Sequence, residues 1–254
     1  MLSGEVNMNS FIENLGVQSY CFRNFKDNRI VAKMVKELGL NKIELCVVHV
    51  DFLDTSKFKE VISIYKDEGV DIYSIGVQYF SNNEVNERKY FEFVEMCGAK
   101  YISADFDINK IFDCFKLVEK LAEEYGVKIA IHNHGGSHWL GNIQSLDYVF
   151  KNTSEKIGLC LDTAWALDSG ISPLKMIETF NKRLYSVHLK DFIFEKNRKA
   201  VDVVFGEGNI DIEKLVNKLK EINFSGPLIF EYEGEPENPV HPIKKGIENF
   251  KKKI

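Results

Sequence analysis

Short apolar runs recur along this chain at intervals of about 30 residues, and a stretch with helical periodicity follows each run. The runs begin near Leu15, Lys42, Asp71, Tyr101, Lys128, Ile157, Leu184 and Pro227. Several of the helical stretches end at a glycine, the residue that most often terminates a helix. These glycines are Gly39, Gly69, Gly98 and Gly126. A strand, a helix and a glycine repeated in this order are typical of βα units.

Eight such units predict an α/β protein whose parallel strands close into a (β/α)8 TIM barrel. An open, doubly wound sheet would carry a glycine-rich phosphate loop after its first strand, but the segment after Val17 reads QSYCFRN. We find no linker or composition shift, so residues 1–254 are predicted to form a single barrel domain. An insert at about 192–210, after the seventh strand, is predicted to lie at the barrel rim and to cover a substrate.

Composition and charge exclude several classes of protein. The chain of 254 residues is 44% hydrophobic, enough for a sizeable core, and its net charge of -5 argues against binding to nucleic acid. Its five cysteines lack paired spacing, which is typical of a reducing compartment. No apolar run is long enough to span a membrane. Residues 1–10 lack the pattern of a signal peptide, so we expect a soluble cytoplasmic protein.

Four of the apolar runs end in polar residues that could share a metal ion. Parallel strands covered on both faces normally read as continuous apolar segments, so these residues break the pattern. They lie at the carboxyl ends of strands, where barrel enzymes have their active sites. Imidazole and carboxylate groups suit Mn, Co, Zn or Fe better than Mg or Ca. The predicted ligands of this divalent cation are His132, Asp162, His188 and Glu231.

Each predicted ligand also has a structural interpretation that needs no metal. His132 could be a core histidine with hydrogen-bond partners, and Asp162 could cap a helix that begins within DTAW. His188 could bond neighbouring carboxylates, while Glu231 could form an ion pair with Lys190. The sequence leaves these alternatives open.

Further residues near the predicted rim are candidates for binding a substrate through hydroxyl groups or by stacking. These are Gln78, Asp105, Trp165 and Glu207. Each could instead be a turn residue or part of the core. We interpret His138, within GGSHWLGN, as loop surface, and Glu44, near the second strand, as a minor rim candidate.

The segments HNHGG, GLCLDTAW, SVHLKD, GEGNID and IFEYE resemble the sugar phosphate isomerase/epimerase superfamily, which has the xylose isomerase-like TIM barrel. The resemblance covers nearly the whole chain and is specific in the second half. It implies one divalent cation, with manganese favoured, held by Glu, Asp, His and Glu after strands five to eight. Asp162, His188 and Glu231 match the last three positions. At the first position the family commonly reads Glu-Asn-His, whereas this chain reads His132-Asn133-His134.

The resemblance implies an isomerase or epimerase that acts on a small sugar or keto-sugar through a metal-stabilised enediolate. The His-rich run is similar to the inosose dehydratase branch, so the alternative is a dehydratase or lyase acting on a keto-cyclitol or keto-sugar. The departure at His132 removes one carboxylate base. Glu231 is then the predicted base, His134 a second acid or base, and Lys190 a group that polarises a substrate oxygen. Barrels of this type often pair, so a homo-oligomer is possible.

Two other classes share this barrel. An apurinic-site endonuclease would need more metal ligands and a basic groove, which six histidines and a net charge of -5 disfavour. A non-catalytic barrel subunit that has lost its metal is consistent with the departure at His132.

Overall fold

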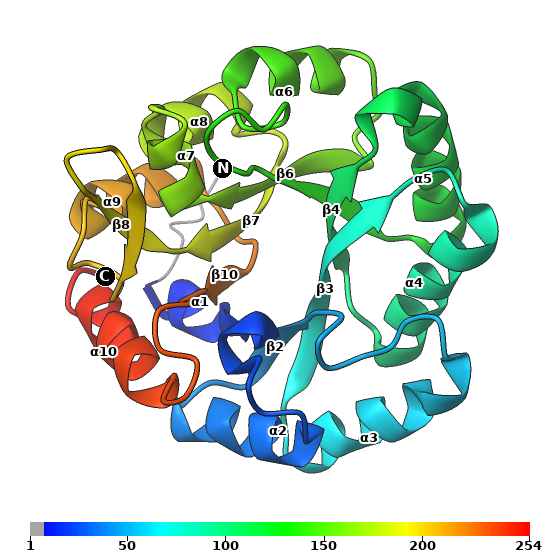
Figure 1. Ribbon diagram of the computed structural model, residues 1–254, viewed down its shortest axis with the longest axis horizontal. Helices are drawn as coiled ribbons and strands as arrows, with labels where there is room; N and C mark the ends of the chain where they lie inside the picture. Colours follow the sequence, from blue (N-terminus) through cyan, green and yellow to red (C-terminus); the bar gives the residue numbers. More distant parts are fainter. Residues whose placement is uncertain (1–7) are drawn as a thin grey trace, which may run out of the picture.

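The computed structural model describes residues 8–254 and shows eight parallel strands closed into a barrel and ringed by helices (Figure 1). Residues 1–7, which begin the segment used for the signal-peptide prediction, lie outside the described part. Around the barrel the strands follow the order β1-β10-β7-β6-β5-β4-β3-β2. Their bounds are β1 Leu15–Gln18, β2 Lys42–Leu45, β3 Asp71–Phe80, β4 Tyr101–Phe106, β5 Lys128–His132, β6 Ile157–Asp162, β7 Leu184–Leu189 and β10 Leu228–Phe230. The predicted (β/α)8 fold is confirmed.

The helices lie outside the strands and bury their apolar faces against them. Their bounds are α1 Met8–Glu13, α2 Asn28–Glu37, α3 Phe58–Asp67, α4 Glu84–Cys97, α5 Ile111–Tyr125, α6 Ile143–Lys151, α7 Thr163–Asp168, α8 Pro173–Phe180, α9 Ile212–Glu221 and α10 Val240–Lys251. Among the helices of residues 8–254, not one combines the length and the apolar character that crossing a membrane requires.

The predicted strand starts agree closely with the structure. The first seven coincide with the observed first residues, and the eighth strand begins at Leu228 rather than Pro227. Pro227 has no backbone N–H to give to a strand ladder, which accounts for the shift of one residue. Two predicted helix ends, Gly98 and Gly126, adopt left-handed backbone conformations with φ of 76° and 66°. Glycine adopts this conformation without a steric penalty, so it ends α4 and α5 cleanly.

The register of the neighbouring strands brings the polar strand ends to one depth in the barrel. His132 pairs with Cys160, two residues before Asp162, and Asp162 pairs with His188. His188 in turn pairs with Ile229, two residues before Glu231. Because alternate residues of a strand share a face, Glu231 points to the same side as Ile229.

The segment predicted as a rim insert forms a small antiparallel sheet of β8 (Asp191–Phe194) and β9 (Ala200–Val203). Asp191 fixes the turn that follows this hairpin. Its carboxylate accepts hydrogen bonds from the backbone N–H groups of Gly206, Gly208, Asn209 and Ile210. The turn then leads to Asp211, which caps α9 by accepting a hydrogen bond from the backbone N–H of Lys214.

Candidate active site

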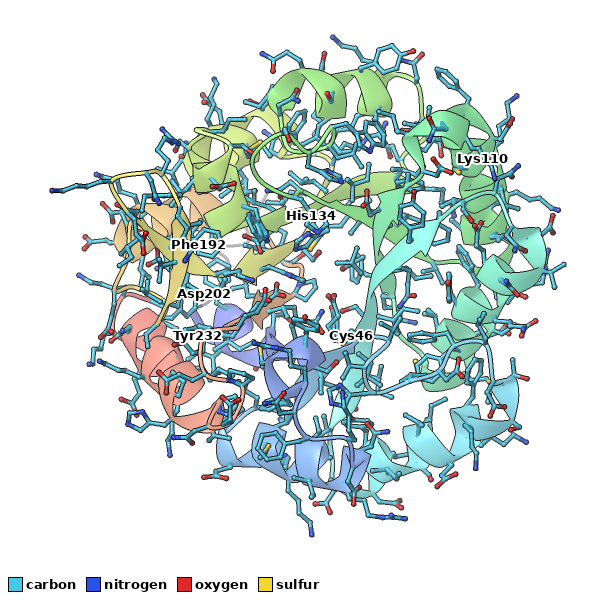
Figure 2. The ribbon with its side chains drawn as sticks, in the orientation of Figure 1. Cys46, Lys110, His134, Phe192, Asp202 and Tyr232 are labelled. Atoms are coloured by element: carbon cyan, nitrogen blue, oxygen red, sulfur yellow. The ribbon has the colours of Figure 1, made fainter. Side chains whose placement is uncertain are left out.

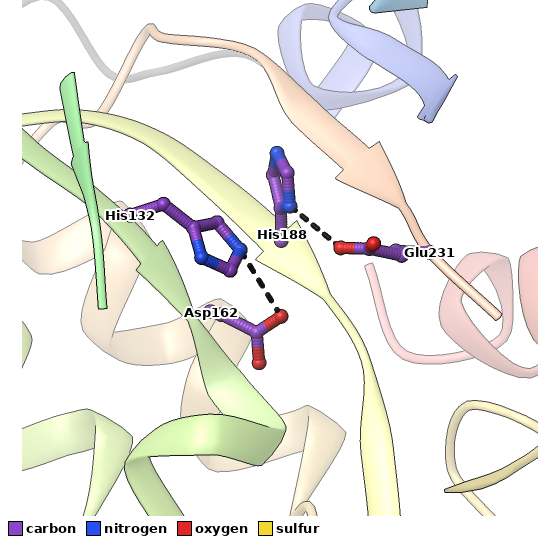
Figure 3. A group of neighbouring side chains, drawn as sticks. All are labelled: His132, Asp162, His188 and Glu231. Atoms are coloured by element: carbon purple, nitrogen blue, oxygen red, sulfur yellow. Dashed lines mark hydrogen bonds and ion pairs between the residues drawn. The ribbon is translucent and has the colours of Figure 1, made fainter. Parts of the chain in front are cut away.

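The structure brings together the four side chains predicted as metal ligands (Figure 3). His132 ends β5, Asp162 ends β6, His188 lies near the end of β7, and Glu231 directly follows β10. One potential ligand atom from each residue lies within 4.8 Å of all the others. Asp162 and His188 are fully buried, and His132 is 3% exposed. The group therefore forms a buried cluster at the carboxyl end of the barrel.

Two contacts define the cluster. Nδ1 of His188 donates a hydrogen bond of 2.8 Å to Oε2 of Glu231. Nε2 of His132 lies 3.5 Å from Oδ2 of Asp162, which is too far for a good hydrogen bond. Within residues 8–254, both nitrogens of His132 and Oδ2 of Asp162 are buried without a hydrogen-bond partner. Unpartnered buried polar atoms are costly, so this cluster has the capacity to bind an ion or a ligand.

Asp162 has a second role that the sequence also suggested. Its Oδ1 accepts a hydrogen bond of 2.8 Å from the backbone N–H of Trp165 and caps α7. The cap and the cluster use different oxygens of the same carboxylate, because Oδ2 is the atom that faces His132. The capping interpretation and the ligand prediction for Asp162 are therefore compatible.

Glu44, interpreted from the sequence as a minor rim candidate, lies against His188 inside the barrel. Its Oε1 is 3.0 Å from Nε2 of His188, and the side chain is fully buried. The Glu44 carboxylate also accepts hydrogen bonds from Gln18 Nε2 (2.6 Å), Ser74 Oγ (2.6 Å) and Ser103 Oγ (2.9 Å). Glu44 thus holds the His188 ring on the side opposite Glu231.

The charged groups of the cluster shift one another's pKa values. Burial alone would raise the pKa of Glu231, but the charge of Lys190 and the hydrogen bond from His188 hold it well below its usual value. Burial alone would lower the pKa of His188, but nearby negative groups, including Glu44, raise it well above its usual value. Burial alone would raise the pKa of Glu44, but the charge of His188 and the hydrogen bonds to the carboxylate together lower it. The three groups therefore stabilise one another in their charged forms.

Lys190 is almost fully buried and lies among carboxylates. Its Nζ contacts Glu233 and lies 3.7 Å from Oδ2 of Asp202 and 3.8 Å from Oε1 of Glu231. Burial alone would lower the pKa of Lys190, but the negative charges, that of Glu231 first, raise it. The ammonium group stays charged and offsets part of the negative charge beside Glu231.

A cavity of about 280 Å³ opens beside the cluster and is lined by His132, His134, Trp165, Glu231 and other residues. Figure 2 shows His134 close to the middle of the barrel opening. Burial, together with repulsion from His132 and then from His138, lowers the pKa of His134 to about 4. The His134 imidazole is therefore neutral near pH 7.

The four residues predicted to bind substrate lie in different places. Trp165 lines this cavity, and Asp105 lines a second, wider cavity beside it. Gln78 is buried, and its Nε2 has no hydrogen-bond partner in the described part of the chain. Glu207 does not join the group: it is exposed, and its carboxylate pairs with Lys245 of α10 at 2.5 Å.

Two residues have contacts that the sequence did not indicate: Glu44 and His138. A carboxylate inside the buried segment KIEL was the available signal for Glu44, because a charged residue in a covered strand needs partners. His138 lies in a loop and is partly exposed, as predicted, but its Nε2 also lies 3.3 Å from Oδ2 of Asp105 and its ring lines the wider cavity. The loop that carries His138 has no periodic pattern, so the sequence contained no comparable signal.

Comparison with known proteins agrees with this architecture. A family model described as xylose isomerase-like TIM barrel matches residues 32–253. Inosose dehydratase of Clostridium beijerinckii is 28% identical over 175 residues, which are 62% of this chain and 58% of that protein. The chain thus spans little more than half the length of that curated relative.

Solved structures with the same fold include two proteins of similar size. D-psicose 3-epimerase of Clostridium cellulolyticum, solved with D-tagatose, has a TM-score of 0.71 at 16% identity, with 94% of this chain and 99% of that chain covered. The IolI protein, solved with a zinc atom, has a TM-score of 0.70 at 17% identity, with 95% and 99% covered. At these identities the likeness concerns the fold alone. Because the family model matches most of the sequence, the chain belongs to the xylose isomerase-like TIM barrel family.

Proposed function

We propose that this protein is a metal-dependent enzyme that removes water from a small keto-cyclitol or keto-sugar. The observation that carries the proposal is the convergence of four potential ligand atoms, all within 4.8 Å of one another, beside a cavity of about 280 Å³. That volume is near the lower end of ligand pockets and suits a single sugar or cyclitol ring.

The donor set is consistent with a divalent transition-metal cation. His132 and His188 supply imidazole nitrogens, and Asp162 and Glu231 supply carboxylate oxygens, a combination typical of Zn, Mn, Co or Fe sites. The unpartnered atoms of His132 and Asp162 would gain a partner on binding it. When bound, such a cation supplies Lewis acidity to a substrate carbonyl. Manganese was favoured from the sequence, and the zinc atom in the IolI structure makes zinc the other ion to test.

Residues of this chain would carry out the proton transfers of the reaction. Glu231 lines the cavity and is ionised, so its Oε1 can accept the proton from the carbon next to the substrate carbonyl. The hydroxyl on the following carbon then leaves and takes up that proton as water, so the product is the substrate less one water. Lys190 keeps Glu231 ionised from behind the cavity wall. His134 also lines the cavity and is the second group that can accept or donate a proton.

The sequence predicted isomerisation or epimerisation, with dehydration as the alternative. Two observations favour dehydration. The curated relative is named inosose dehydratase. In addition, His132 occupies the position of the family's first glutamate, which leaves Glu231 as the carboxylate base of the ligand set at the cavity. Epimerisation at one carbon requires proton transfer on both of its faces, whereas elimination of water needs a base on one face.

Product mass tests this assignment. The protein, loaded with zinc or manganese, is incubated with an inosose and with a panel of keto-sugars, and the products are analysed by mass spectrometry. We expect the loss of one water, abolished in the Asp162→Asn variant. A product of unchanged mass would instead assign isomerisation, the second candidate, which begins with the same proton removal. Absence of any product with every loaded metal would contradict the proposed function.

A further inference from the structure

A second, wider cavity of about 650 Å³ adjoins the first and shares His134 and Trp165 with it. Asp105, His138 and Trp139 also line it. A single ring bound at the four-ligand cluster would leave this outer space unfilled. The residues around it offer two indole rings together with a carboxylate and imidazoles, the combination of apolar faces and polar groups that binds hydroxylated rings.

The polar groups of the outer cavity are held in fixed positions. Oδ1 of Asp105 accepts a hydrogen bond of 2.8 Å from the backbone N–H of Phe106, and Oδ2 lies 3.3 Å from Nε2 of His138. Nδ1 of His138 accepts a hydrogen bond of 3.3 Å from the backbone N–H of Leu140. Asp105 is therefore oriented before any ligand binds, which lowers the entropy cost of binding.

The same hydrogen bonds argue against a second metal ion here. Asp105, His134 and His138 have ligand atoms within 4.8 Å of one another, so they meet the spacing of a metal site. However, Nδ1 of His138 must be unprotonated to accept from Leu140, so the ring proton is on Nε2, facing Asp105. An Nε2–H group has no lone pair for a metal, and it can donate to the carboxylate instead.

The loop that carries these groups is packed closely against Trp165. A Cβ on Gly135 would lie 2.6 Å from Cε3 of Trp165, so only glycine allows this approach. The loop closes through a hydrogen bond of 2.9 Å from the backbone N–H of Gly141 to the carbonyl of His138. Nδ1 of His134, at the junction of the two cavities, is buried without a partner among the described residues. These contacts hold the wall of the outer cavity in a fixed shape.

We propose that the outer cavity is a second carbohydrate subsite, so that the substrate is a glycoside whose second hydroxylated ring lies against Trp139 and Trp165 and bonds Asp105. This inference rests on the proposed function, because it places the reacting ring in the inner cavity. The carboxylate of Asp105 accepts hydrogen bonds from ring hydroxyls, and the indoles cover an apolar ring face.

Binding of matched one-ring and two-ring ligands tests the subsite. Calorimetry on the metal-loaded protein would compare 3-keto-glucose with 3-keto-cellobiose, which adds one glucosyl ring. We expect 3-keto-cellobiose to bind at least about tenfold more tightly, as one charge-assisted hydrogen bond would give. In the Asp105→Asn and Trp139→Ala variants this ratio should fall to about one. Trp139→Phe should keep most of it, and Asp113→Asn, on the exposed face of α5, should keep all of it.

The outcomes of this experiment distinguish failure of the subsite from failure of the proposed function. Equal affinity of the wild-type protein for the two ligands would overturn the subsite, while turnover of 3-keto-glucose would leave the proposed function standing. A preference for 3-keto-cellobiose without turnover of either ligand would support the subsite and contradict the proposed function. A preference that survives Asp105→Asn and Trp139→Ala would overturn the assignment of these residues. Binding of neither ligand would overturn both proposals.

Discussion

Nε2 of His188 lies 3.0 Å from Oε1 of Glu44, a fully buried carboxylate, while Nδ1 of the same ring bonds Glu231 at 2.8 Å. The His188 imidazole thus lies between two carboxylates, one that precedes it in the sequence and one that follows it. A metal ion at the cluster would replace the proton on Nδ1, and Glu44 would then be the partner of the other nitrogen, the usual arrangement that fixes the ring of a metal-binding histidine and raises its basicity. Glu44 is therefore a positioning residue, and its partners Gln18, Ser74 and Ser103 hold it in turn.

Replacing Glu44 with Gln should weaken metal binding by about 10- to 100-fold, the usual effect of losing an outer partner of a ligand. The amide keeps the size of the side chain but not the charge that faces His188. Competition with a chromogenic chelator measures the affinity. Ser103→Ala, which removes one of three hydrogen bonds to Glu44, should have a smaller effect. An unchanged affinity in Glu44→Gln would show that His188 does not depend on this carboxylate.

Substitutions of Asp162 should separate its two roles. Asparagine can still cap α7 by accepting from Trp165 but lacks the anionic oxygen, so Asp162→Asn should lose metal binding without losing the cap. Asp162→Ala loses both, so its free energy of unfolding in chelator should be about 1 kcal/mol lower than that of Asp162→Asn. Chemical denaturation and metal titration of both variants give these values. Metal binding at wild-type affinity in Asp162→Asn would limit Asp162 to the capping role.

Asp202 of β9 should make the stability of the protein depend on pH. Burial raises its pKa from 3.8 to about 7, although Lys190 opposes the shift, and Glu233 and Glu231 add to it. A raised carboxyl pKa means that the folded state holds a proton that the unfolded state has lost. Its stabilising effect is therefore full below pH 3.8 and is lost as the pH rises through about 7.

The free energy of unfolding should accordingly fall between about pH 4 and about pH 7, by on the order of 1.4 kcal/mol for each pH unit in which Asp202 is protonated in the folded state and ionised in the unfolded state. In Asp202→Asn this part of the slope should disappear. Urea denaturation in the presence of chelator at several pH values measures it. Equal slopes in the wild-type protein and Asp202→Asn would show that Asp202 does not retain its proton.

Replacing Gly135 with Ala should destabilise the loop between the two cavities. The added methyl group would lie 2.6 Å from Cε3 of Trp165 and 2.8 Å from Cβ of Asp168, and overpacking of this kind costs about 1–3 kcal/mol. Thermal unfolding measures the loss, and tryptophan fluorescence reports displacement of Trp165. Ser137→Ala, at an exposed position of the same loop, is the matched control and should be near neutral. A Gly135→Ala variant as stable as this control would contradict the close packing.

The barrel and the four-ligand cluster could be predicted because both depend on local patterns. Strand starts follow from apolar runs between glycines, and the alternation of faces along a strand places Asp162 and His188 at one depth. The surroundings of Glu44 could not be predicted in the same way. Ser74 and Ser103 come from other strands and meet Glu44 only when the barrel closes.

The positions of His138 and Glu207 also could not be predicted, because they depend on the conformations of two loops. His138 reaches Asp105 because the loop after β5 turns back through the bond between Gly141 and His138. Glu207 turns outward because Asp191 binds the backbone of its neighbours, Gly206 and Gly208. These contacts depend on backbone hydrogen bonds rather than on hydrophobic periodicity, so spacing alone did not indicate them.

Anomalous diffraction from crystals grown with zinc or manganese tests the central claim most directly. The account predicts one strong peak at about 2.0–2.3 Å from donor atoms of His132, Asp162, His188 and Glu231, and no peak between Asp105, His134 and His138. A map without density for a cation at the four-ligand cluster, under conditions in which the ion is in excess, would contradict it.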